Sequence, residues 1–153
     1  MTSFLSGGHL SEYLAAFGAD VVKIESPRRP DGYRFVVTYP ALGDHWWERS
    51  PLWQAQNLKK RSLVLELSLA EGRKVLELLL SQADVIAENY TPRVLESFGF
   101  GYEKVREINP GIVMVRMPAF GLEGPWRDHV GFAYNIEQLA GMAQNGDPED
   151  GFP

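Results

Sequence analysis

The chain has 153 residues, enough for one folded domain with its own hydrophobic core. Twenty acidic residues against fifteen Lys and Arg give a net charge of −5, which argues against general nucleic-acid binding. The absence of cysteine excludes disulfides, thiolate catalysis and cysteine-ligated metals. No apolar run reaches the ~18 residues of a membrane span, and the first residues do not resemble a signal peptide. We therefore predict a cytoplasmic protein with no membrane partner.

The first predicted unit is a helix that leads directly into a short buried strand. We expect a loop over Thr2 to Gly8, a helix from near His9, a left-handed stop at Gly18, and a strand over residues 21–25. A helix followed by such a strand is the second half of a βαβ unit. A further strand is therefore expected ahead of the helix. The pair Gly7-Gly8 suits either a phosphate-binding turn or a simple turn.

No clear hydrophobic period holds from residue 26 to residue 56, where four prolines and several aromatics lie among charged residues. A loop of this length in a compact domain is usually functional or covers another surface. Arg28 and Arg29 directly follow the strand end, where α/β proteins bind ligands. They suit either an anion site or a solvated pair.

Strands and helices then alternate. The leucines of residues 63–67 alternate as in a half-covered strand, and Ser68 with Glu71 forms a predicted capping box. The helix that follows, to about residue 82, has an apolar stripe of Val75, Leu76, Leu79 and Leu80.

The remaining predicted elements complete this alternation. Residues 83–89 form a buried strand, and Thr91 caps a helix that has Pro92 in its first position. A short helix over 102–108 precedes a strand over 112–117, whose apolar run predicts cover on both faces. A last helix is expected over 131–141.

This order predicts an α/β fold: a Rossmann-like, mostly parallel sheet with helices on both faces, incomplete at both ends. Residues 1–142 form the predicted domain, and residues 143–153 form a turn-rich tail that leads to a missing continuation. Asp147 and Asp150 in this tail are interpreted as solvated turn acids. The three histidines, His9, His45 and His129, share no ligand spacing, so no metal site is predicted.

An ordered set of short motifs resembles the amino-terminal section of one family. The motifs are Leu-Ala-x-x-Gly-Ala-Asp-Val-Val-Lys-Ile-Glu-x-Pro at 14–27, Lys-Arg-Ser at 60–62, Glu-Gly-Arg at 71–73, Ala-Asp-Val-Ile-x-Glu-Asn-Tyr-x-Pro at 83–92, Val-Leu-Glu at 94–96, Gly-Phe-Gly-Tyr at 99–102, Asn-Pro at 109–110 and Phe-Gly-x-x-Gly-Pro at 120–125. Together they are similar to the class III CoA-transferases, the CaiB/BaiF family. That family includes formyl-CoA transferases and α-methylacyl-CoA racemases, and the resemblance covers essentially all of the chain.

The resemblance implies an enzyme that moves CoA between an acyl-CoA thioester and a carboxylic acid. An aspartate of such enzymes attacks the acyl-CoA to give a mixed anhydride and then an enzyme thioester. The thioester is a substrate, and no further cofactor is implied. Members combine a Rossmann-type large domain with a smaller domain and interlock as homodimers, so a second copy or a complementing chain is the expected partner.

The same resemblance suggests where this chain contacts CoA. No catalytic residue is assigned, because the nucleophilic aspartate of the family lies beyond residue 153. The loop before the first helix, the arginine pair and the end of the strand over 83–89 line the family's CoA groove. The candidate CoA-binding residues are Leu5, Ser6, Arg28, Arg29, Asn89 and Tyr90.

Two departures from the family pattern affect the prediction. Glu66-Leu67-Ser68 stands where relatives have Asp-Leu-Lys, which removes one phosphate contact, and Phe132 stands where racemases have histidine. Four alternatives stay open: a transferase fragment, the racemase branch, a non-catalytic CoA- or nucleotide-binding module, and an interaction fragment completed by another chain. The first is preferred. We expect weak CoA binding and no turnover by this chain alone.

Overall fold

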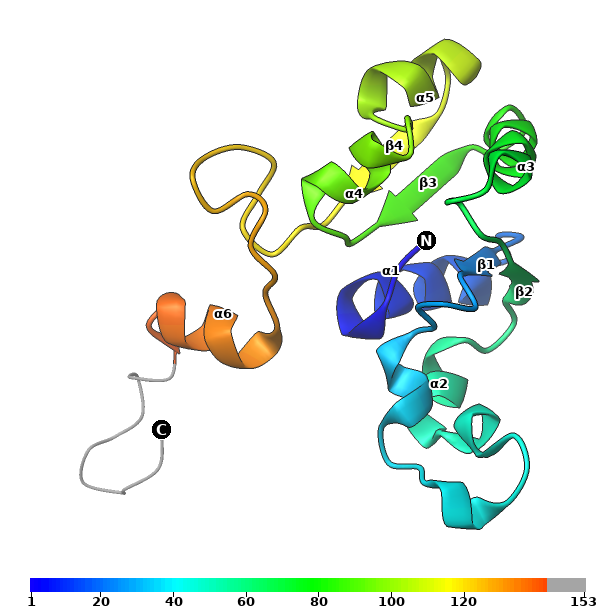
Figure 1. Ribbon diagram of the computed structural model, residues 1–153, viewed down its shortest axis with the longest axis vertical. Helices are drawn as coiled ribbons and strands as arrows, with labels where there is room; N and C mark the ends of the chain where they lie inside the picture. The colour runs from blue at the N-terminus through cyan, green and yellow to red at the C-terminus, as the bar shows by residue number, and fades with distance from the viewer. Residues whose placement is uncertain (143–153) are drawn as a thin grey trace.

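The computed structural model describes residues 1–142, so the predicted tail with Asp147 and Asp150 lies outside the described residues. Helices and short strands alternate along the chain (Figure 1). The elements are α1 (Phe4–Ala16), β1 (Val22–Glu25), the 3₁₀ helices η1 (Gly32–Phe35), η2 (Pro40–Leu42) and η3 (Trp46–Arg49), α2 (Pro51–Gln56), β2 (Arg61–Val64), α3 (Ala70–Leu80), β3 (Val85–Glu88), α4 (Pro92–Ser97), α5 (Tyr102–Ile108), β4 (Val113–Arg116) and α6 (Ala133–Leu139).

The four strands form two separate parallel pairs. Val22 of β1 lies opposite Arg61 of β2, and Val85 of β3 lies opposite Val113 of β4. Parallel pairs joined through helices are the mark of an α/β fold, so the predicted fold class is confirmed. The first residues of the chain lie between β1 and β3 (Figure 1).

The hydrophobic core lies where α3 and α5 pack on the strands. Its buried residues are Leu65, Leu67, Leu76, Leu80, Ile86, Phe100, Val105 and Ile112. The predicted stripe of α3 is therefore half right, because Leu76 and Leu80 are buried while Val75 is 40% exposed. Val113 is also exposed, so the prediction that β4 is covered on both faces is wrong within residues 1–142.

The predicted loop before the first helix is wrong. α1 begins at Phe4, and Gly7 and Gly8 are buried inside it. A Cβ atom on Gly7 would lie 2.2 Å from the Thr2 side chain, and one on Gly8 would lie 2.1 Å from Gln56 Oε1. The glycines therefore permit close packing rather than a phosphate-binding turn. The close packing of Gly7 against Thr2 and of Gly8 against Gln56 offsets the roughly 1 kcal/mol that each glycine costs in a helix interior.

The segment from residue 26 to residue 56 is not an open loop, since it contains η1, η2, η3 and α2. These helices are too short for a hydrophobic period, and side-chain caps are found on η1 and α2 but not on η2 or η3. The Asp31 carboxylate accepts a hydrogen bond from the N–H of Tyr33 at the start of η1. Ser50 Oγ accepts one from the N–H of Trp53 in α2.

Two predicted helix caps are wrong. α3 begins at Ala70 with Leu69 at its N-cap, and the N–H of Ser68 instead donates to Glu66 Oε1 at 3.0 Å. Thr91 makes no side-chain cap bond at the start of α4, although Pro92 occupies the first turn as predicted. The left-handed stop after α1 is confirmed, since Gly18 has φ of 99°.

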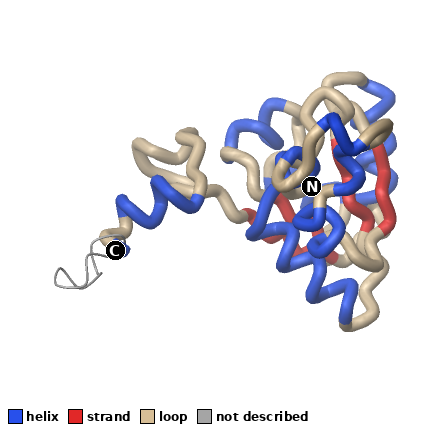
Figure 2. Tube along the Cα trace, turned by 90° about the horizontal axis from the view of Figure 1, so that it is seen from below, coloured by secondary structure: helices blue, strands red, loops and turns tan. Residues whose placement is uncertain are grey.

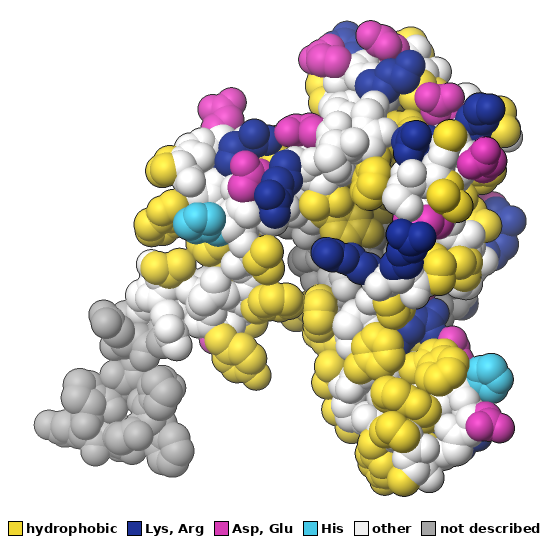
Figure 3. Space-filling view, in the orientation of Figure 1, with side chains coloured by type: hydrophobic (Ala, Val, Ile, Leu, Met, Phe, Trp, Pro, Cys, Tyr) yellow, Lys and Arg dark blue, Asp and Glu magenta, His cyan; other side chains and the backbone are white. Residues whose placement is uncertain are grey.

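Helix α6 lies apart from the rest of the described chain (Figures 1 and 2), and none of its residues is buried. On the main body, hydrophobic side chains gather over the 3₁₀ segments (Figure 3). Exposed members of this patch include Phe35, Val37, Tyr39 and Trp47. Within residues 1–142, none of the helices combines the length and hydropathy needed to cross a bilayer.

Candidate functional site

Asn89 fixes the segment that leads into α1. Its Oδ1 accepts a hydrogen bond from the N–H of Ser3 at 2.8 Å. Its Nδ2 donates to the Ser3 carbonyl at 2.6 Å and to Ser6 Oγ at 3.1 Å. The side-chain amide thus holds the residues ahead of α1 beside the end of β3. Two of the candidate residues, Ser6 and Asn89, are thereby brought into direct contact although they are 83 positions apart.

The first turn of α1 presents Leu5 and Ser6 to solvent. The N–H groups that open a helix have no acceptor within it and carry a partial positive charge. The N–H of Phe4 donates to Asp31 Oδ1 at 3.0 Å. The exposed face of this turn, beside Asn89, therefore provides a polar surface at the carboxyl end of β3.

Tyr90 follows Asn89 and is held by the strand end. Its N–H donates to Glu88 Oε2 at 2.8 Å, and Glu88 is itself buried against Arg116, with Nε 2.8 Å from Oε1. Burial, and then the negative charge of Glu88, raises the pKa of the Tyr90 hydroxyl to about 12. The phenol is therefore neutral at physiological pH and available as a hydrogen-bond donor.

Arg28 and Arg29 lie in an exposed turn directly after β1. The N–H of Arg29 donates to the Ser26 carbonyl, and Arg28 Nε lies 3.7 Å from Glu66 Oε2. Hydrogen bonds from the Ser26 hydroxyl and from Ser68 lower the pKa of Glu66 to about 2, so this carboxylate is ionised. The Arg28 side chain is 73% exposed, and such a pair constrains it little.

The candidate residues thus form two groups at the carboxyl ends of the strands. One contains Leu5, Ser6, Asn89 and Tyr90, and the other contains the arginine pair. No direct hydrogen bond or ion pair joins the two groups within residues 1–142.

Asp31 connects the start of α1 to β1, and the sequence analysis did not identify it. Its Oδ1 accepts hydrogen bonds from Ser3 Oγ and from the N–H of Phe4 and Tyr33. Its Oδ2 lies 2.6 Å from Lys23 Nζ, and the side chains of this pair are only 2% and 3% exposed. The Asp31 carboxylate therefore fixes the start of α1 against β1.

A second buried ion pair supports the first. Arg34 binds both carboxylate oxygens of Glu25, at 3.0 and 2.8 Å, and its Nη1 donates to Glu48 at 2.6 Å. The Trp53 ring covers the guanidinium at 3.7 Å from its centroid. Lys23 and Glu25 alternate with Val22 and Ile24 in β1. Two charges on one face of an otherwise apolar strand are the signal that would have revealed both pairs.

The buried charged groups described so far are paired with one another, whereas Arg28 and Arg29 lie in an exposed turn. Within the described range, no three His, Asp or Glu side chains gather as possible metal ligands. His9 lies near Glu12, His45 near Trp47 and His129 near Trp126.

Comparison with known proteins identifies the family. The family model for CoA-transferase family III matches residues 1–153. The chain is 35% identical to the succinyl-CoA–D-citramalate CoA-transferase of Chloroflexus aurantiacus, over 92% of this chain and 34% of that protein. It is 38% identical to the beta subunit of the succinyl-CoA–L-malate CoA-transferase of the same organism, over 85% and 31%. The chain spans about a third of the length of these relatives.

A solved structure agrees with this match. A CaiB/BaiF family protein from Brucella suis superposes with a TM-score of 0.85 at 29% identity, covering 97% of this chain and 39% of that one. The motif-based prediction is confirmed, and the chain belongs to the family III CoA-transferases, the CaiB/BaiF family.

Proposed function

We propose that the chain is part of a CoA-transferase that moves CoA between an acyl-CoA thioester and a carboxylic acid. The observation that carries this proposal is the family match over all 153 residues. The relatives described above are named as transferases of CoA between acids. No cofactor beyond the CoA thioester is needed for such a transfer, and a cytoplasmic location is part of the same proposal.

In this proposal the described residues hold CoA at the carboxyl ends of β1 and β3. The guanidinium groups of Arg28 and Arg29 are exposed and able to bind phosphate through charge-assisted hydrogen bonds. The start of α1, with Leu5 and Ser6, adds backbone N–H groups and a favourable dipole. Asn89 acts through Ser6, which its Nδ2 contacts at 3.1 Å, and Tyr90 contributes a neutral hydroxyl.

The nucleophilic carboxylate of the transfer is proposed to come from outside the described residues. The chain alone then binds CoA weakly and does not turn over. A second copy or a complementing chain is the proposed partner. The occurrence of separate alpha and beta subunits among relatives of this chain supports complementation.

The racemase branch receives less support from the geometry. Phe132 stands where racemases have histidine, and its ring packs edge-on against Phe4 at 5.2 Å between centroids. An aromatic hydrocarbon cannot move the α-proton that racemization requires.

Calorimetric titration of the chain with free CoA tests the binding part of the proposal. Replacing both arginines (Arg28→Ala with Arg29→Ala) is expected to weaken binding about tenfold or more, because the loss of even one hydrogen bond to a charged group costs about 1.5 kcal/mol or more, and about 1.4 kcal/mol is a factor of ten in affinity. Lys104→Ala on α5 is the matched control, since it removes an exposed cation far along the chain whose nearest carboxylate is 3.8 Å away. CoA binding that is equal in the double variant and the control would contradict the assignment of the arginines.

A second assay addresses catalysis and the competing function. Incubation of the chain with an acyl-CoA and a free acid is expected to give no CoA exchange. Exchange at a measurable rate would contradict the proposed absence of the nucleophile. An interaction fragment would instead show no CoA binding at all.

A further inference from the structure

The ends of β1 and β2 bring an acidic side chain beside the arginine pair. Glu25 of β1 lies opposite Val64 of β2, and the N–H of Leu65 donates to the Glu25 carbonyl at 2.9 Å. Beyond these residues the two segments stay side by side, because Ser26 Oγ donates to Glu66 Oε2 at 2.7 Å. The turn that carries the arginines and the Glu66 carboxylate therefore leave the sheet together, at its carboxyl edge.

The Glu66 carboxylate is held in one place. Its Oε1 accepts a hydrogen bond from the N–H of Ser68 at 3.0 Å, and the side chain is only 17% exposed. Ser26 Oγ also accepts a hydrogen bond from the N–H of Arg28 at 3.1 Å, so one hydroxyl connects the carboxylate to the arginine turn. Because the bonds from Ser26 and Ser68 lower the pKa of Glu66 to about 2, the carboxylate is negatively charged at physiological pH.

A phosphate on the arginine pair would lie within reach of this charge. The Arg28 side chain is 73% exposed, and its Nε lies 3.7 Å from Glu66 Oε2. A phosphate oxygen about 2.8 Å from another nitrogen of the guanidinium group is then within about 9 Å of the carboxylate. This separation is shorter than the Debye length, which is about 10 Å at about 0.1 M salt. A phosphate bound there is therefore repelled by Glu66 while Arg28 attracts it.

The strength of this repulsion depends on the kind of phosphate. Near neutral pH a phosphate monoester carries a charge of about −2, because its second pKa is about 6, whereas each phosphate within a diphosphate linkage carries about −1. Coulomb repulsion from a fixed carboxylate is proportional to that charge. CoA contains a 3′-phosphate monoester and a diphosphate, and dephospho-CoA contains only the diphosphate. The two ligands therefore differ in the group that Glu66 opposes most.

We propose that Glu66 is a specificity-determining residue, whose fixed charge cancels much of the attraction between the arginine pair and the 3′-phosphate of CoA. This inference rests on the proposed function. Thioesters of CoA and of dephospho-CoA are then nearly equivalent ligands of this chain, because recognition depends on the diphosphate and thioester arm that they share.

Calorimetric titration with CoA and with dephospho-CoA at low salt tests this selectivity. Glu66→Gln removes the charge and keeps the size of the side chain and one acceptor oxygen. The substitution is expected to tighten CoA binding about threefold or more, and dephospho-CoA binding by less than about twofold. The wild-type chain is expected to bind the two ligands with affinities within about threefold of each other.

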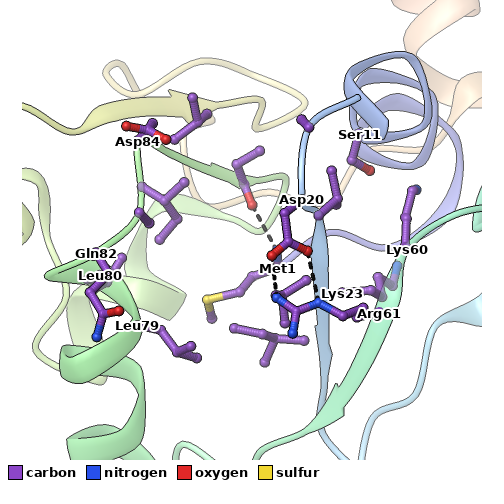
Figure 4. A pocket seen from close by; sticks show the side chains of 18 of the residues that line it. Met1, Ser11, Asp20, Lys23, Lys60, Arg61, Leu79, Leu80, Gln82 and Asp84 are labelled. Carbon is purple, nitrogen blue, oxygen red and sulfur yellow. Dashed lines mark hydrogen bonds and ion pairs between the residues drawn. The ribbon is translucent and has the colours of Figure 1, made fainter. Parts of the chain in front are cut away.

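Asp20→Asn is the matched control, because it removes one negative charge from the opposite end of the same strand pair. Asp20 Oδ1 accepts a hydrogen bond from Arg61 Nε at 2.8 Å, and both side chains are exposed. A cavity of about 600 Å³ lies between β1 and β3, and this ion pair lines it (Figure 4). The control is expected to leave both affinities unchanged. An equal gain in Asp20→Asn would assign the effect to net charge and overturn the proposal.

The ligand comparison also decides against the proposal in two other cases. CoA affinity that Glu66→Gln leaves unchanged overturns it, as does an equal gain for CoA and dephospho-CoA. If the variant does not fold, the wild-type chain decides alone. CoA binding that is about tenfold or more tighter than dephospho-CoA binding then overturns the proposal.

Failure of the proposed function gives a different pattern, in which neither nucleotide binds the wild-type chain. Inorganic phosphate, followed by NMR at the Nε–H of Arg28, then tests the effect of the Glu66 charge without CoA. Tighter phosphate binding in Glu66→Gln than in the wild-type chain supports the proposal. Equal or undetectable phosphate binding in the two chains overturns it.

Discussion

Replacing Asp31 with asparagine removes the negative charge of the buried ion pair but keeps the size of the side chain. The substitution therefore measures how much the ion pair contributes to the free energy of unfolding. Asparagine retains an oxygen that accepts from the N–H groups of Phe4 and Tyr33. Its amide nitrogen, however, would face Lys23 Nζ, which now lies 2.6 Å from the carboxylate. The change therefore leaves a buried ammonium group beside a second donor.

The magnitude follows from the burial of the pair. The side chains of Lys23 and Asp31 are only 3% and 2% exposed. Removal of the Asp31 charge therefore leaves the Lys23 ammonium group buried, without a counter-ion and without access to water. Such changes cost about 3–5 kcal/mol. For a chain of this size, the corresponding fall in Tm is about 10 °C or more. The Thr2 carbonyl, 2.7 Å from Lys23 Nζ, accepts a hydrogen bond but supplies no negative charge.

The assay is urea unfolding followed by circular dichroism, with Asp20→Asn as the matched control. Asp20 pairs with Arg61, but these side chains are 70% and 68% exposed, so this substitution is expected to cost less than about 1 kcal/mol. Adding Lys23→Met to Asp31→Asn removes the unpaired ammonium group and is expected to restore part of the lost free energy of unfolding. The double-mutant cycle gives the coupling energy of the pair. If Asp31→Asn costs no more than Asp20→Asn, the reasoning from burial is refuted.

Two further predictions concern packing and pH. Gly72→Ala is expected to destabilise the chain by about 1–3 kcal/mol in the same unfolding assay, because the new Cβ would lie 2.1 Å from the backbone oxygen of Glu66. Gly111→Ala, whose Cβ meets nothing closer than 3.6 Å, should cost less, and equal losses would contradict the packing argument. The second prediction rests on the buried Met1 amino group, whose pKa falls from 8.0 to about 5 on folding. Since the unfolded chain binds the proton more tightly, the free energy of unfolding should rise between pH 5 and pH 8. N-terminal acetylation should flatten this rise, and an unchanged slope in the acetylated chain would exclude Met1 as its source.

Local patterns in the sequence predicted most of the elements because those patterns are short-range. The left-handed Gly18 and Pro92 in the first turn of α4 each specify backbone geometry within a few residues. The alternating leucines of residues 63–67 predicted β2 only in part, because this strand spans Arg61–Val64. The family followed from motif order for the same reason. The role of Gly7 and Gly8 did not follow, because it depends on Thr2 and on the distant Gln56.

In the candidate site, too, some features depend on neighbouring residues and others on residues far apart in the chain. Its strand-end positions were predictable, since parallel strands direct their carboxyl ends to one edge. Their assignment as CoA contacts stays a prediction. The contact of Asn89 with Ser3 and Ser6, and the pairing of Lys23 with Asp31, bring together residues that no local pattern relates.

The sequence by itself determined the α/β class, the order of the elements and the family of this protein, because hydrophobic period, turn residues and motif spacing are properties of neighbouring residues. Only the tertiary structure decided which charges are buried and which strand edges face a cavity. Burial and backbone pairing depend on segments far apart in the chain, such as β1 and β3, which close on each other only in the folded molecule.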